Sequence, residues 1–236
     1  MINLKKILEH VLDYDEYKKT NELHDSLKEH YNKPSIDIPH INTMYDYMGT
    51  ESRYINSHLW DEHRIKNGQY PEKRYISPYG NNRINENISS LDHTLSSYKT
   101  PHALTVYSGT PHDPRELKDK NDIVHHPAYL STSLSKYNAE NFANYRYSNY
   151  TYKGLSKPSD KGIIKSIHHH HVLKIHVPEG HAGYYASTLS NSFRPEKEFI
   201  LPRGTNLKHL RTAKKVYNKS DLEERHSFIH HMEVVP

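Results

Sequence analysis

Two glutamates, Glu196 and Glu198, are separated by one residue at the start of the apolar run 199–201. Residues two apart in a strand point to the same face, so this spacing predicts two carboxylates side by side. Such a pair repels unless a cation lies between its members or one of them is protonated. The pattern therefore indicates either a functional carboxylate pair or a solvated strand edge whose charges prevent aggregation.

Two other segments carry polar groups at the ends of expected strands. Ser131, Thr132 and Ser133 place three hydroxyls at the end of the run that begins at residue 127. They either contribute to a site or cap the helix that follows. Ser108 and Gly109 end the run 105–109, where a glycine either lets a ligand approach the backbone or marks an ordinary turn.

Four consecutive histidines at 168–171 raise the question of a metal site. Alternate side chains of a strand point to opposite faces, so at most two of the four could share an ion at this tract. Metal binding is therefore not expected there. Cysteine is absent, which excludes disulfides, thiolate metal sites and a cysteine nucleophile.

Composition narrows the class of protein. The 236 residues predict one large domain or two small ones. Mean hydropathy is −0.96, yet 11% of residues are aromatic, which supplies a core and argues against disorder. No apolar run approaches the length of a membrane span. The net charge, 32 − 28 = +4, is too small and too evenly spread to indicate nucleic-acid binding. Glu9 interrupts any secretory signal, so we expect an intracellular protein or one delivered without a classical signal.

The elements that must position these residues change in type near residue 100. Apolar residues at helical spacing predict helices over 3–32 (with a separate, more polar helix from about 21 to 31), 41–48, 52–65 and 83–95. Beyond Pro101 short strands are expected at 103–107, 127–133, 172–177, 198–201 and 228–235, with one helix over 135–145. Short strands without alternating long helices favour an α+β fold over a doubly wound parallel sheet.

The order of these features resembles the arginine-specific mono-ADP-ribosyltransferases of the Arg–Ser–Glu class. A polar strand end before residue 110 is followed by Ser-Thr-Ser and then by Glu-x-Glu. Segments 47–59, 171–180 and 196–205 are similar to the helical lobe and core of that family, and the likeness covers roughly 40–215. Segments 106–109 and 231–235 are similar to the Alt and Mod enzymes of tailed bacteriophages.

The resemblance implies the ADP-ribosyltransferase fold, in which an N-terminal helical lobe precedes two packed, mainly antiparallel β-sheets. We expect an N-terminal helical extension over 1–36 and the transferase domain over 37–236. Within that domain the helical lobe spans 37–100 and the β-rich catalytic core spans 101–236.

The resemblance also implies NAD as the substrate and assigns roles to the polar residues. Glu198 resembles the catalytic carboxylate that stabilises the oxocarbenium-like state as nicotinamide leaves. Ser131 would hold Glu198 by a hydrogen bond, while Thr132 and Ser133 would brace the strands around it. Glu196 would accept the guanidinium of a target arginine.

Other positions are expected to contact NAD or the target. Gly109 would offer its backbone to the carboxamide, and the ring of Phe142 would stack on nicotinamide. Residues 184–195 would form the loop that recognises the target protein. The expected partner is a protein that presents arginine, such as host transcription or translation machinery. No metal, membrane or nucleic acid is implied.

One position departs from the family pattern. Members usually carry arginine before the glycine of the first strand. This chain has Ser108 there, which is uncharged and too short to replace a guanidinium. Arg115 and Arg146 are candidate replacements at the NAD pyrophosphate. Two alternatives therefore remain: a pseudoenzyme or NAD-binding module, and an NAD glycohydrolase in which water replaces the target. We expect a monomer in the host cytoplasm or carried in a virion.

Overall fold

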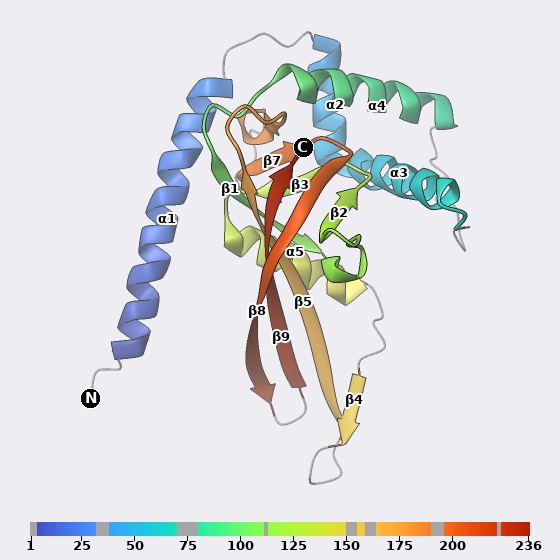
Figure 1. Cartoon of the computed structure of the whole chain (residues 1–236). Coiled ribbons are helices and arrows are strands. Elements are labelled where there is room, and N and C mark those ends of the chain that lie inside the picture. The colour runs from blue at the N-terminus through green and yellow to red at the C-terminus, as the bar shows by residue number, and fades with distance from the viewer. Residues whose placement is uncertain are drawn as a thin grey trace.

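The computed structural model describes residues 4–31, 38–69, 80–110, 113–149, 155–158, 164–189, 196–220 and 223–236. Helices α1 to α4 come first and the strands follow, with α5 between β3 and β4 (Figure 1). The helices are α1 (Leu4–Tyr31), α2 (Ile38–Asp46), α3 (Ser52–Lys66), α4 (Gly80–Ser97) and α5 (Lys136–Asn149). The strands are β1 (Leu104–Thr110), β2 (Ile123–His126), β3 (Leu130–Ser133), β4 (Leu155–Pro158), β5 (Ile164–Val177), β6 (Tyr184–Tyr185), β7 (Glu198–Leu201), β8 (Thr205–Ser220) and β9 (Glu223–Val235). The α+β class is confirmed.

The strands form one hydrogen-bonded sheet in the order β2-β8-β9-β5-β1-β3-β7-β6, with β4 added to β5. All pairs are antiparallel except β5 with β9. Seven residue pairs join β1 to β5, whereas Tyr107 with Ser133 is the one pair that joins β1 to β3. The two sheets expected from the sequence are therefore two groups of strands linked at a single residue pair.

Helices α1 to α4 share the larger hydrophobic cluster with the sheet, while Ala139 and Ala143 of α5 form a smaller cluster with Tyr107 and Val172. Buried side chains from the helices, such as Leu27, Met44 and Leu91, belong to the same cluster as Val106 of β1 and Phe199 of β7. Burial of apolar side chains across both regions holds the helices against the strands. No helix among the described residues is both long enough and apolar enough to cross a membrane.

Helix α1 is one continuous helix of 28 residues, not the two helices expected from its pattern. Its last residue, Tyr31, is buried and donates its hydroxyl to the carbonyl oxygens of Lys99 and Gly183, each at 3.3 Å. The Tyr31 ring also meets Tyr184 of β6 edge-on, with centroids 5.4 Å apart. The C-terminal end of α1 thus packs on the β-rich part, and the boundary proposed at 36/37 stays a prediction.

A five-residue π-helical turn, Tyr47–Glu51, separates α2 from α3. Gly49 has non-helical dihedral angles (φ −89°, ψ −127°), so the chain changes direction there. The turn buries Tyr47 completely, and the Tyr47 ring meets Tyr129 edge-on at 5.6 Å. This kink directs a tyrosine of the helical lobe toward strand β3.

Candidate active site

Glu198 is the first residue of β7 and pairs with Ser133 of β3. Its side chain is partly buried, and burial raises the pKa of its carboxyl group to about 7. A hydrogen bond from the Ser131 side chain lowers this pKa, while the negative charge of Glu196 raises it. A carboxylate that loses its proton near neutral pH beside a hydroxyl donor is typical of a functional site.

Glu196 lies before β7 and is exposed, so the two glutamates do not share a strand face as expected. Lys197 between them adopts a left-handed conformation (φ 50°), which breaks the strand alternation. The Ser133 hydroxyl and the Asn138 side-chain amide both donate to the Glu196 carbonyl, at 2.6 and 2.9 Å. The backbone next to Glu198 is therefore fixed by the end of β3 and the first turn of α5.

Further hydrogen bonds hold the start of β7. Thr132 is buried and donates its hydroxyl to the carbonyl of Phe199 at 2.5 Å. The backbone N–H of Glu198 donates to the hydroxyl oxygen of Ser187 at 2.8 Å. Ser135 caps α5, because its side-chain oxygen accepts from the N–H of Asn138 at 3.4 Å. Hydroxyl groups thus fix the backbone around Glu198 and cap the adjacent helix.

Tyr47 was missed as a site residue by the sequence argument. Asn56 donates its amide to the Tyr47 hydroxyl at 3.1 Å, and that hydroxyl lies 3.5 Å from the Ser131 side-chain oxygen, the outer limit of a hydrogen bond. Because Ser131 donates to Glu198, each of these groups is able to donate to the next. The sequence signal was the segment 47–59, but helical spacing does not reveal which of its side chains reaches the sheet.

Ser108 and Gly109 serve packing and backbone contacts in this structure. Ser108 is buried and donates its hydroxyl to the Ser131 carbonyl at 3.0 Å. A Cβ atom on Gly109 would lie 2.3 Å from the carbonyl oxygen of Ala139 and 2.5 Å from the nitrogen of Ala143. The glycine is therefore required by the close approach of α5 to β1, where the sequence had suggested room for a ligand.

Of the two arginines expected near the NAD pyrophosphate, Arg115 already has a partner, and the side chain of Arg146 is not described. Arg115 donates through Nε and Nη2 to the Asp113 carboxylate at 2.5–3.0 Å, and its guanidinium lies 5.8 Å from the Phe228 ring centroid. This arginine already has a carboxylate partner, which weighs against it as the missing cation. Arg146 belongs to α5, but its side chain lies outside the described residues.

The remaining expected site residues lie on α5 and after β6. Phe142 is 42% exposed, so its ring is open to a ligand. In the expected target loop 184–195, residues 190–195 lie outside the described part of the chain. Tyr184 and Tyr185, at the start of that range, are buried in strand β6 instead of forming a loop.

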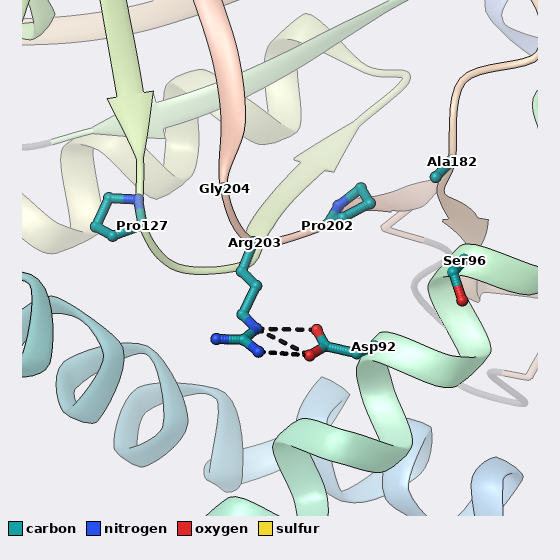
Figure 2. A pocket seen from close by; sticks show the side chains of 7 residues that line it. All are labelled: Asp92, Ser96, Pro127, Ala182, Pro202, Arg203 and Gly204. Atoms are coloured by element: carbon teal, nitrogen blue, oxygen red, sulfur yellow. Dashed lines mark hydrogen bonds and ion pairs between the residues drawn. The ribbon is translucent and has the colours of Figure 1, made fainter. Parts of the chain in front are cut away.

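A cavity of about 460 Å³ lies beyond the other end of β7, lined by Asp92, Ser96, Pro127, Ala182, Pro202, Arg203 and Gly204 (Figure 2). Arg203 and Asp92 form an ion pair across it at 2.7 Å, and the Tyr129 hydroxyl donates to Asp92 at 2.7 Å. The two charged side chains that line it, Arg203 and Asp92, are paired with each other. Glu198 lies at the first residue of β7, whereas the cavity borders the residues that follow its last. This cavity is therefore separate from the candidate active site.

Comparison with known proteins identifies the family. The sequence model described as ADP-ribosyltransferase exoenzyme matches residues 18–227. A search of curated protein sequences found no significant match.

Several solved structures with the same fold are ADP-ribosyltransferase toxins. The chain is similar to Plx2a, an ADP-ribosyltransferase toxin from Paenibacillus larvae, with 17% identity, a TM-score of 0.58, and coverage of 94% of this chain and 97% of that one. It is similar to the Vibrio splendidus ADP-ribosyltransferase Vis in complex with agmatine, with 15% identity, a TM-score of 0.56, and coverage of 93% and 86%.

A third similar structure is the ADP-ribosylating toxin BECa of a C. perfringens binary enterotoxin with NADH, with 15% identity, a TM-score of 0.59, and coverage of 92% of this chain and 48% of that one. At these identities the likeness establishes the fold, while the match over 18–227 establishes the family. The chain therefore belongs to the ADP-ribosyltransferase exoenzyme family, whose enzymes use NAD as the donor of ADP-ribose.

Proposed function

We propose that this protein transfers ADP-ribose from NAD to arginine side chains of a target protein and releases nicotinamide. The observation that carries the proposal is the contrast between Glu198, partly buried and bonded to Ser131, and Glu196, exposed on a fixed backbone. The first suits a group that acts on NAD inside the site. The second suits a group that meets a cation arriving from solvent.

In this reaction the bond between the ribose C1′ and the nicotinamide nitrogen breaks, and its electron pair stays with nicotinamide. Ionised Glu198 stabilises the positive charge that develops on the ribose. A guanidinium nitrogen then bonds to C1′ and loses a proton. Glu196 receives the guanidinium through two parallel hydrogen bonds, orients it and is the group available to take that proton.

The guanidinium acceptor has indirect support from a relative of the same fold. Agmatine, the small molecule bound in the Vis structure, carries a guanidinium group on an alkyl chain. An exposed carboxylate is the matching partner for that group, because a guanidinium binds carboxylates in a bidentate manner.

The test compares Glu196→Ala with a matched control, Glu179→Ala, whose glutamate is exposed in the turn after β5. Wild-type protein is incubated with labelled NAD and agmatine, and both ADP-ribosyl-agmatine and free ADP-ribose are measured. We expect Glu196→Ala to lose transfer to agmatine and to keep some NAD hydrolysis, while Glu179→Ala keeps both. Equal loss of both activities in Glu196→Ala would overturn the acceptor role.

A second candidate function is an NAD-binding module with little turnover, and Ser108 is the observation that favours it. The residue has no charge, and its hydroxyl donates to the Ser131 carbonyl. NAD binding by the wild type without nicotinamide release would support this candidate. Free ADP-ribose without any modified acceptor would support the NAD glycohydrolase instead.

We further propose, from the sequence resemblance alone, an enzyme of the phage Alt or Mod type that acts as a monomer on host transcription or translation proteins. Incubation of a bacterial lysate with labelled NAD and the full chain, followed by mass spectrometry, identifies the modified proteins. Label on ribosomal or RNA polymerase subunits is the expected result. Label confined to other proteins contradicts this target class.

A further inference from the structure

A second cluster of titratable groups lies on the long strands β5 and β9 and on the chain after β1. His171 of β5, His230 of β9 and Asp113 each offer one ligand atom, and these atoms lie within 4.8 Å of one another. Both histidines are buried and Asp113 is partly buried. The Nδ1 atom of His171 lies 2.9 Å from the Nε2 atom of His230.

We propose that Asp113, His171 and His230 form a binding site for a divalent transition-metal ion of the zinc class. Two imidazole nitrogens and one carboxylate oxygen are a ligand set that such ions accept. Ligand atoms on one tetrahedral zinc ion lie about 3.3 Å apart, given bond lengths of about 2.0–2.1 Å. The separations here, from 2.9 Å up to 4.8 Å at most, bracket that value, so small side-chain movements suffice.

A surrounding layer of hydrogen bonds orients these ligands. The Nδ1 atom of His230 lies 2.9 Å from the Thr212 hydroxyl oxygen, which in turn lies 2.9 Å from Nε2 of His209. When His230 donates through Nδ1 to Thr212, its Nε2 lone pair points toward His171. Partners of this kind fix the tautomer and the ring orientation of metal-binding histidines.

Positive groups face the cluster and oppose an added cation. Arg115 acts on His230, and Lys214 acts on His169, which lies two residues before His171 on the same strand. The bidentate pairing of Arg115 with Asp113 offsets part of that repulsion. The site is therefore expected to bind less tightly than one without these cations.

The three proposed ligands come from three segments of the chain, and only His171 belongs to the tract 168–171. Strand alternation limits how many histidines of 168–171 share one ion, but it says nothing of β9 or of the chain after β1. A bound ion would join Asp113, β5 and β9 in a chain that has no cysteine for a disulfide. Three protein ligands also leave a fourth position for water or another small ligand.

The test uses the full chain, freed of metal with EDTA and then dialysed. Zn²⁺ binding is measured by calorimetry, and Co²⁺ binding by its visible absorption bands, which report coordination geometry. We expect one equivalent of each ion to bind at a saturable site. Asp113→Asn and His230→Asn should each weaken binding at least tenfold, whereas the control His231→Asn, on the residue next to His230, should bind as the wild type does.

A positioning variant sharpens the test. Thr212→Val removes the hydroxyl beside His230 and should weaken binding about 10- to 100-fold, as other losses of ligand-orienting partners do, whereas Thr212→Ser should restore it. Far-UV circular dichroism checks that each variant is folded. If His230→Asn does not fold, Asp113→Asn and Thr212→Val still decide the matter. Absence of stoichiometric binding by the wild type, or unchanged binding in Asp113→Asn, overturns the proposal.

Discussion

Glu198 and Asp113 are both partly buried carboxylates, yet their surroundings move their pKa values in opposite directions. Burial raises the pKa of Glu198 to about 7, and the nearby Glu196 adds to that rise. Hydrogen bonds from Arg115 overcome the burial of Asp113 and hold its pKa at about 2. The contrast shows that burial alone does not set the charge of a site, because the neighbouring donor decides it.

The difference also separates two uses of a carboxylate. Glu198 is held by a neutral hydroxyl, which leaves its charge available to a substrate. The Asp113 carboxylate is paired with the Arg115 guanidinium, which suits a residue that holds the structure together. Substitutions around either carboxylate therefore test the comparison.

Removal of the Glu198 charge should have the largest effect. Glu198→Gln keeps the size of the side chain but loses the charge that faces the developing cation, so turnover should fall about 10²- to 10³-fold. Nicotinamide release measures it, with Glu179→Gln as the control in an exposed turn. Folding should persist, because the variant also removes an unfavourable buried charge. A rate within twofold of the wild type would contradict the catalytic assignment.

The raised pKa of Glu198 predicts a pH dependence near neutrality. The ionised form acts on NAD, so kcat/KM for nicotinamide release from NAD should rise with pH and level off above an apparent pKa of about 7. Below that value it should fall about tenfold for each pH unit. Glu196→Gln should shift the profile to lower pH, because a like charge is lost. Ser131→Ala should shift it to higher pH, because a hydrogen bond to the ionised form is lost. Shifts in the same direction would contradict this account.

The raised pKa of Glu198 also predicts that the contribution of this residue to the free energy of unfolding falls as pH rises. Between about pH 4.5 and 7 the folded state keeps a proton on Glu198 that the unfolded state has lost, so this residue destabilises the fold at alkaline pH.

The lowered pKa of Asp113 has the opposite effect on stability. Its contribution is complete above about pH 4 and disappears as pH falls toward 2, and Asp113→Asn should remove about 1–2 kcal/mol of it after allowance for solvent around Arg115. Urea unfolding of wild type and variant at pH 6 and pH 3 measures the difference.

A smaller effect on kcat is expected from the row of hydrogen-bonded side chains that connects the helical lobe to Glu198. Tyr47→Phe keeps the buried ring but removes the hydroxyl between Asn56 and Ser131. One neutral hydrogen bond contributes about 0.5–1.5 kcal/mol, so kcat should fall about 2- to 10-fold with little change in KM. Tyr129→Phe is the matched control, because its hydroxyl bonds to Ile88 and Asp92 away from Glu198.

The smallest effect is expected at the position where the family carries arginine. Ser108→Ala should leave NAD affinity within about threefold, since one neutral hydrogen bond is lost. Arg115→Ala should also leave it within that range, because Asp113 already binds this guanidinium. Calorimetry with NAD measures both. A tenfold loss in Arg115→Ala would return this residue to the pyrophosphate site, and Arg146→Ala tests the other candidate.

Local patterns in the sequence predicted the elements around Glu198. Strand β7 has the bounds expected from the apolar run that follows Glu198, and α5 begins just after the capping residue Ser135. These features depend on neighbours in the chain, so spacing and residue type suffice. The left-handed Lys197 between the two glutamates has no such signal, and it moved Glu196 out of the strand.

Strand β8 was missed for a reason that the structure makes plain. Its apolar residues Leu207, Leu210, Ala213 and Val216 recur every three positions, which matches neither strand face. A shift of register between His209 and Arg211 changes the alternation, and Leu210 within it is 53% exposed. The partners of the histidine tract and the contact of Tyr47 with Ser131 are likewise set by tertiary packing, which spacing along the chain does not encode.

The single residue pair between β1 and β3 divides the sheet into two weakly joined halves next to Glu198. On one side lies the ladder of β1 with β5, and on the other lie β3, β7 and β6 with Glu198. Packed side chains in the shared core, not a row of backbone hydrogen bonds, keep these two halves aligned. Separation of the two halves therefore breaks few hydrogen bonds, and amide hydrogens at the β1–β3 junction should exchange with solvent sooner than those between β1 and β5 or between β3 and β7.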